Sequence, residues 1–68
     1  MINLSKFSEV LGELIFDGGL TAKSLAAALG AEPSTITRYL KGERVPSVEN
    51  LVAIANYFNC STDFLLGK

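Results

Sequence analysis

The chain has 68 residues, of which 49% are apolar, and its formal net charge at pH 7 is −1. This length allows one domain, over residues 1–68, and the apolar fraction argues against a disordered chain. Because the sequence has no His and a single Cys, it excludes an internal disulfide and a Cys/His zinc site, and we expect a reduced, cytoplasmic protein without a metal or another cofactor.

Apolar residues recur at helical spacing close to the start of the chain. Phe7, Leu11 and Leu14 follow one another at steps of four and three residues, which predicts a helix over about 5–17. Ser5 is expected to cap the N-terminus of this helix, and the pair of glycines after it is expected to end it.

A second helix is expected over about 21–29, because Thr21 is a suitable N-cap and apolar residues follow it at helical spacing. The inner face of this helix should hold Leu25, Ala28 and Leu29. The glycine directly after the helix is expected to adopt a left-handed conformation and to end it.

Pro33 opens a third helix, expected over about 33–41, because a residue without an N–H is tolerated in the first helical turn. Ile36, Tyr39 and Leu40 are spaced so that they should face inward. The glycine that follows this segment is expected to end the helix, as it does after the second one.

Two more helices are expected before the end of the chain, capped by Ser47 and Ser61. The longer one carries an apolar stripe made of Val48, Leu51, Val52, Ala55 and Phe58. The uncharged run 50–62 is too short to span a bilayer, so we expect no contact with a membrane. The sequence thus predicts an all-α fold, a compact bundle of about five short helices without a strand.

The second and third predicted helices form one unit, because two helices joined by a short turn that contains Gly are typical of a helix-turn-helix. Ala26 supplies the small residue that a close helix crossing needs, and Gly30 supplies the turn. With its flanking residues, this unit resembles the XRE family of Cro and phage-repressor regulators, from about Phe7 to Gly67. The matching residues are Leu25, Ala26, Leu29, Gly30, Ile36, Tyr39, Gly42, Pro46, Ser47 and the closing FLLG.

The resemblance implies a lambda-repressor-like domain of prokaryotic or phage origin, which binds double-stranded DNA through a recognition helix at residues 33–41. It also implies a homodimer on an inverted repeat, with dimer contacts expected from Tyr57, Phe64 and Leu65. The sequence fits a complete small regulator as well as the DNA-binding part of a longer chain.

Polar side chains form a stripe along the third predicted helix. The stripe consists of Ser34, Thr37, Arg38 and Lys41, at positions i, i+3, i+4 and i+7. Short hydroxyls let a helix end approach base edges, an Arg can bind guanine O6 and N7, and a Lys suits phosphates. Residues 21–44 also carry a net charge of +2 within an acidic chain. The alternative interpretation of the stripe is an ordinary solvated face.

Two groups of residues are expected to contact DNA. Base edges should be read by Pro33, Ser34, Thr37 and Arg38. The sugar-phosphate backbone should be held by Thr21, Ala22, Lys23, Thr35, Tyr39, Lys41 and Arg44. Ala22 departs from the family pattern, which usually has a phosphate-binding Gln there, but the backbone amides at this helix N-terminus remain able to hold a phosphate.

Other positions also depart from the family pattern. Glu32 stands where Ser or Thr is common, and we expect it to cap its own helix, the alternative being a hydrogen bond from cytosine N4. Phe16 is expected to cover the edge of the core or to belong to a partner surface, and Cys60 is expected to pack in the core. The acidic row on the first predicted helix is interpreted as a solvated face rather than an acid–base or cation site.

The expected function is sequence-specific, DNA-binding regulation of transcription, by repression. The alternative is a protein-interaction module, such as an antitoxin or an anti-repressor target with weak DNA affinity, which the acidic net charge and Ala22 favour. An enzyme is not expected, because the sequence has no His, no glycine-rich phosphate loop and no nucleophile–base pair.

Overall fold

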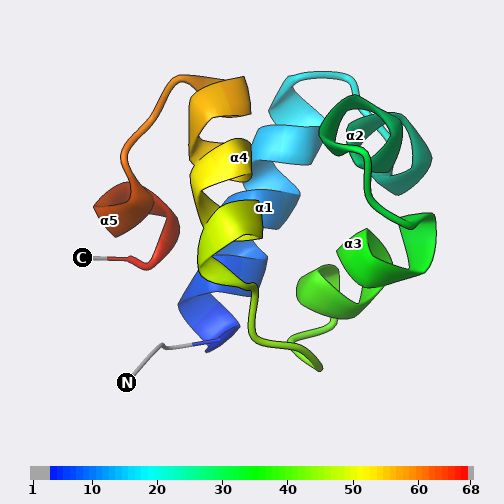
Figure 1. The fold of residues 1–68 in the computed structure, drawn as a ribbon. Helices are drawn as coiled ribbons and strands as arrows, with labels where there is room; N and C mark the ends of the chain where they lie inside the picture. Colours follow the sequence, from blue (N-terminus) through cyan, green and yellow to red (C-terminus); the bar gives the residue numbers. More distant parts are fainter. Residues whose placement is uncertain (1–3, 68) are drawn as a thin grey trace.

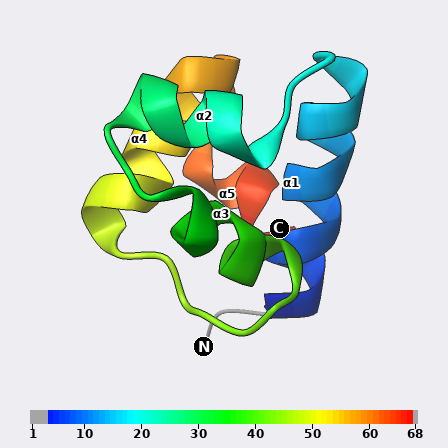
Figure 2. The ribbon, with the colours of Figure 1, turned by 90° about the vertical axis from the view of Figure 1, so that its right-hand side faces the viewer.

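The computed structural model describes residues 4–67, and this part of the chain contains helices and no strand. The helices are α1 (Leu4–Asp17), α2 (Ala22–Leu29), α3 (Pro33–Leu40), α4 (Val48–Phe58) and α5 (Thr62–Leu65). In Figure 1, α5 lies on the side of α4 that faces away from α2 and α3. Figure 2 shows α1 and α4 on opposite sides of the bundle. The predicted all-α bundle of five helices is confirmed, and the bounds of α2 and α3 agree with the prediction to within one residue.

Short hydroxyl side chains cap α2, α4 and α5 where the sequence predicts them. The Thr21 hydroxyl accepts a hydrogen bond from the Ser24 amide at 3.0 Å, and Ser24 Oγ accepts one from the Thr21 amide at 2.9 Å. This reciprocal pair is a capping box, which satisfies two N–H groups at once. The Ser47 and Ser61 hydroxyls accept bonds from the amides three residues later, at 3.1 and 3.0 Å.

Two expectations about the ends and faces of the first helices are wrong. The helix α1 begins at Leu4, so Ser5 lies inside it and does not cap it. Ala28 is exposed, because Leu25 and Ala26 carry the face of α2 that packs into the bundle. Helical spacing places Leu25 and Ala28 on the same broad face of the helix, and only the tertiary contacts decide how much of that face is covered.

The predicted apolar stripe of α4 is wrong at two positions, whereas Leu51 and Phe58 pack against the core as predicted. Val48 and Val52 are 77% and 42% exposed, whereas Ile54 and Ala55 are buried. The apolar residues of α4 are spread over a wide arc of the helix, and the core covers only the part of that arc around Ile54. The two valines lie one turn apart at the uncovered edge of this arc.

Every helix contributes to a single core. Its buried apolar members are Phe7, Leu11, Ile15, Leu25, Ala26, Ile36, Tyr39, Ile54, Ala55 and Leu65. The helix α3 packs against α1 and α2, and α5 packs against α1 and α4. The position of α3 is therefore set by two neighbours that are themselves anchored in the core.

Tyr39 connects α3 to two other helices. Its ring meets the ring of Phe7 in α1 edge-on, with the ring centroids 5.6 Å apart. Its hydroxyl accepts a hydrogen bond from Nδ2 of Asn50 in α4 at 2.9 Å. Its carbonyl accepts a bond from Oγ of Ser8 in α1 at 2.6 Å. These contacts fix the rotation of α3 about its axis and keep its opposite face toward solvent.

Candidate nucleic-acid interface

The turn between α2 and α3 lets the two helices pack closely. Gly30 ends α2 with φ 70°, a left-handed conformation that costs a residue with a Cβ about 1–2 kcal/mol. The Ala31 amide bonds to the Ala26 carbonyl at 2.8 Å and closes the last turn of α2. Ala26 is completely buried. The predicted conformation of Gly30 is confirmed, and the burial of Ala26 fits the close helix crossing predicted for it.

The helix α3 has one buried and one exposed face. Ile36 and Tyr39 are buried against the bundle. The exposed polar stripe consists of Ser34, Thr37, Arg38 and Lys41. Pro33 is exposed at the start of the helix, and Thr35 is half-buried. The structure therefore brings the residues expected to read bases together on one exposed face of one helix.

Some polar atoms of α3 are engaged inside the protein. Tyr39 is 1% exposed and its hydroxyl is bonded to Asn50, so the expectation that its side chain holds the DNA backbone is wrong. Asn50 is a positioning residue that the sequence did not indicate, because its partner lies 11 residues earlier on another helix. The Thr37 hydroxyl donates to the Pro33 carbonyl at 3.1 Å, which leaves its lone pairs free to accept a hydrogen bond.

The first turn of α2 places a second set of residues at the surface. Thr21 and Lys23 are exposed, and Ala22 is half-buried. The capping box engages the amides of Thr21 and Ser24. The amides of Ala22 and Lys23 belong to the first turn and have no acceptor within the helix, so they suit an anion.

Two cations lie where the chain leaves α3, one at the end of the stripe and one beyond it. Lys41 ends the helix and Arg44 follows in the loop, and both side chains are exposed. The loop turns through Gly42, whose φ is 72°, and the Glu43 amide bonds back to the Arg38 carbonyl at 2.9 Å. This bond keeps the start of the loop against the end of α3, so its cations extend the exposed face of the helix.

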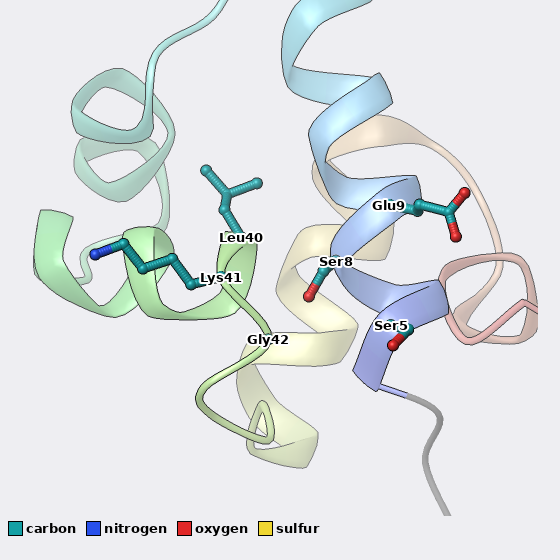
Figure 3. A pocket seen from close by; sticks show the side chains of 6 residues that line it. All are labelled: Ser5, Ser8, Glu9, Leu40, Lys41 and Gly42. Carbon is teal, nitrogen blue, oxygen red and sulfur yellow. The ribbon is translucent and has the colours of Figure 1, made fainter.

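A surface hollow of about 430 Å³ lies between α1 and the end of α3 (Figure 3). It is lined by Ser5, Ser8, Glu9, Leu40, Lys41 and Gly42. In Figure 3 the Lys41 side chain extends away from α1, and the Glu9 carboxylate points to the far side of α1, so the two charges do not meet. The Ser8 hydroxyl is already bonded to the Tyr39 carbonyl. These side chains do not form a nucleophile–base pair.

Neither a metal centre nor a membrane span is found among residues 4–67. The Cys, Asp and Glu side chains of this range do not gather into a group that could hold a metal ion. Within the same range, each helix is too short or too polar to cross a bilayer. The acidic side chains of α1, Glu9, Glu13 and Asp17, are all exposed, as expected of a solvated face.

Glu32 stands at the N-cap position of α3 but its side chain does not cap the helix. Its backbone is extended, with φ −78° and ψ 140°, and its carboxylate accepts no hydrogen bond from the first turn. Pro33 has no N–H, and the Thr35 amide bonds to the Glu32 carbonyl at 3.0 Å, so few donors remain for the carboxylate. The expectation that Glu32 caps its own helix is wrong.

Of the three residues expected to form dimer contacts, two are exposed and one is buried. Tyr57 and Phe64 are 45% and 51% exposed. Leu65 is completely buried in the core, so the expectation that its side chain contacts a second copy is wrong. Phe16 is 84% exposed and does not cover the edge of the core.

Cys60 is half-buried and packs against the core, which confirms the role predicted for it. Desolvation by burial raises the pKa of its thiol above the ordinary value. The thiol therefore stays protonated at neutral pH, and a protonated thiol is a poor nucleophile and a poor metal ligand. This environment is that of a packing residue.

A family model described as helix-turn-helix matches residues 17–65 of the chain. The HTH-type transcriptional regulator ImmR of Bacillus subtilis (strain 168) is 36% identical over 50 residues, which are 74% of this chain and 39% of that protein. The chain thus corresponds to less than half the length of this curated relative.

Solved structures of two regulatory proteins superpose closely on the chain. The SOS-response transcriptional repressor LexA from Eubacterium rectale does so with a TM-score of 0.89 and 30% identity, over 93% of this chain and 67% of that one. The restriction-modification controller protein C.AhdI from Aeromonas hydrophila gives a TM-score of 0.83 and 29% identity, over 91% of this chain and 94% of that one. These likenesses agree with the fold predicted from the sequence.

Proposed function

Because this chain belongs to the XRE-type helix-turn-helix family, we propose that it is a sequence-specific DNA-binding regulator of transcription that inserts α3 into the major groove. One observation carries the proposal. The polar stripe of α3 is exposed along its length, while Ile36 and Tyr39 anchor the opposite face in the core. A rigidly held helix with hydroxyls at its start and cations at its end has the shape and the charge of a major-groove reader.

Base reading is assigned to the start and the middle of α3. Pro33 and Ser34 are short and stand at the helix N-terminus, where a recognition helix approaches base edges most closely. Arg38 carries the bidentate donor that matches guanine O6 and N7, which is worth about 1–3 kcal/mol of discrimination. Thr37 contributes an acceptor and a methyl group, because its hydroxyl proton is engaged by the Pro33 carbonyl.

Phosphate contacts are assigned to two places that flank α3. The free amides of Ala22 and Lys23, with the Lys23 ammonium and Thr21, form one of them. The exposed cations Lys41 and Arg44 form the other, with the half-buried Thr35 closer to the helix start. Since residues 21–44 are net positive and the rest of the chain is net negative, the charge distribution favours approach to DNA through this face.

We further propose that the protein acts in the cytoplasm as a homodimer on an inverted repeat, and that it represses transcription. Two copies would place their recognition helices about 34 Å apart, in successive major grooves on one side of the duplex. Tyr57 and Phe64 are exposed and offer apolar surface for such a contact. Repression is suggested by the relative described as a transcriptional repressor.

A second candidate function is a protein-interaction module with weak DNA affinity. It is favoured by exposed apolar side chains, above all Phe16 and Val48, at 84% and 77% exposure. Large exposed apolar side chains offer surface to another protein, and they indicate a binding site where several of them gather in a patch. The same binding experiment separates the two functions.

The test compares two substitutions on two DNA duplexes. A preferred site is first selected from a random library, and binding to this site and to a scrambled duplex is followed by fluorescence anisotropy at several salt concentrations. Arg38→Ala should lose the preference for one base pair, at a cost of about 1–3 kcal/mol on the selected site only. Lys41→Ala should weaken both duplexes alike and lower the salt slope by about one unit.

A matched control is provided by Lys6→Ala, which removes an exposed cation whose side chain packs against Gly67 instead of lying on α3. It should change neither the sequence preference nor the salt slope. Equal effects of Arg38→Ala and Lys41→Ala on both duplexes would contradict base reading by α3. Absence of binding by the unaltered protein at low salt would favour the interaction module.

A further inference from the structure

The carboxylate of Glu32 is left without a partner at the start of α3. The side chain is exposed and makes no cap to the first turn. Among residues 4–67, no hydrogen bond or ion pair engages it. The first turn of α3 offers the carboxylate only the Ser34 amide, because Pro33 has no amide donor and the Thr35 amide is already bonded to the Glu32 carbonyl.

The position of Glu32 makes an unpaired carboxylate costly for binding DNA. Glu32 directly precedes Pro33 and Ser34, at the N-terminus of α3. In the proposed function this end of the helix enters the major groove. A negative charge at this place is repelled by the phosphates on either side of the groove. The repulsion is offset only if the carboxylate finds a hydrogen-bond donor on the floor of the groove.

The chemistry of the base edges selects one base for this role. Guanine presents the acceptors N7 and O6 to the major groove, and thymine presents the acceptor O4. Adenine places its N6 donor beside the acceptor N7, which repels a carboxylate. Cytosine presents its N4 amino group, a donor, with no acceptor of its own on that edge. A carboxylate therefore fits cytosine and opposes the other three bases.

We propose that Glu32 is a specificity-determining residue of the DNA site, and that its carboxylate accepts a hydrogen bond from the N4 amino group of a cytosine. This inference rests on the proposed function of α3. The cytosine lies beside the base pairs that Ser34 and Arg38 contact, because Glu32 directly precedes the exposed stripe of α3 to which both residues belong. Glu32 raises specificity at the expense of affinity, since every site without this cytosine retains the repulsion.

The test is a selection from a random duplex library, carried out in parallel with the unaltered protein and with Glu32→Gln, Glu32→Ala and Glu13→Gln. The unaltered protein should enrich cytosine at one position of each half-site, with about a tenfold preference over the other bases. Glu32→Gln should shift the preference at that position toward adenine, whose N6 and N7 match an amide. Glu32→Ala should lose the preference without gaining another.

The substitution Glu13→Gln is the charge control, because it removes an exposed carboxylate from α1 and leaves α3 unchanged. It should preserve the cytosine preference. Circular dichroism and thermal melting of each variant check that the fold is kept, which is expected for substitutions of exposed side chains.

Two results would overturn the inference, and they differ in what they say about the proposed function. If the Glu32 variants bind all duplexes more tightly by one factor while the base preferences stay unchanged, the carboxylate only repels phosphate, and base reading by Arg38 still stands. If the unaltered protein enriches no sequence and shows no salt-dependent binding to any duplex, the proposed function fails together with the inference.

Discussion

Removing the hydroxyl of Tyr39 should destabilise the domain by a small, predictable amount. Tyr39→Phe keeps the buried ring and its edge-on contact with Phe7, and deletes only the acceptor of the Asn50 amide at 2.9 Å. A net hydrogen bond of this kind is worth about 0.5–1.5 kcal/mol. Asn50 is half-buried, so water can replace the lost acceptor and the cost should stay near about 1 kcal/mol.

Removing the donor of this hydrogen bond should destabilise the domain more than removing its acceptor. Asn50→Ala leaves the Tyr39 hydroxyl in place with 1% of the residue exposed, and a buried polar group without a partner costs about 1–3 kcal/mol. The higher helix propensity of Ala over Asn in α4 offsets about 0.5 kcal/mol of this loss. In the double variant no partner is left unsatisfied, so its destabilisation should be smaller than the sum of the single effects by about 1 kcal/mol.

Thermal unfolding followed by circular dichroism measures these differences. For a domain of 68 residues, the entropy of unfolding is about 0.14 kcal/mol/K, so a loss of about 1 kcal/mol lowers Tm by about 7 °C. Tyr57→Phe is the matched control, because it removes the hydroxyl of a tyrosine that is 45% exposed, and it should change stability by less than about 0.5 kcal/mol. Additive effects of Tyr39→Phe and Asn50→Ala would refute the coupling between α3 and α4 that positions the polar stripe of α3.

Three further predictions concern the backbone, the core and the cysteine. Gly30→Ala should destabilise the domain by about 1–2 kcal/mol, because the φ of Gly30 is 70°. Gly12→Ala should stabilise it by up to about 1 kcal/mol, because Gly12 lies inside α1 with ordinary room for a Cβ, and equal Tm shifts of the two variants would contradict this. Ala26→Leu should cost about 1–3 kcal/mol or prevent folding, since the site is completely buried, and an unchanged Tm would show that α2 can move away from its neighbours. Cys60 should react with iodoacetamide more slowly in the folded protein than in denaturant at pH 8, because burial raises the pKa of its thiol, and equal rates would contradict that environment.

The helices and their caps could be predicted because their determinants are local. Thr21, Ser47 and Ser61 each bond to an amide three residues later, and such a bond depends on little beyond the adjacent sequence. The left-handed end of α2 follows from Gly30 in the same way. The exposed stripe of α3 could also be predicted, because helical spacing separates its polar residues from Ile36.

The parts that could not be predicted depend on which surfaces meet in three dimensions. Leu65 and Val48 both belong to apolar patterns, and the packing of α5 and α4 buries one and leaves the other 77% exposed. The bond from Asn50 to Tyr39 joins two helices and has no local sequence pattern. Glu32 stands at a cap position in the sequence, but Pro33 and the bond of the Thr35 amide leave few donors in the first turn for its carboxylate.

The central claim is that α3 and its flanking cations form the surface that binds DNA. It is tested most directly by titrating isotope-labelled protein with a short duplex and following the backbone amide NMR shifts at low and at high salt. The account predicts shifts confined to about residues 21–23 and 33–44, and their loss at high salt, because phosphate contacts release counterions. Shifts centred on α1 and α5, or an absence of shifts at low salt, would contradict it.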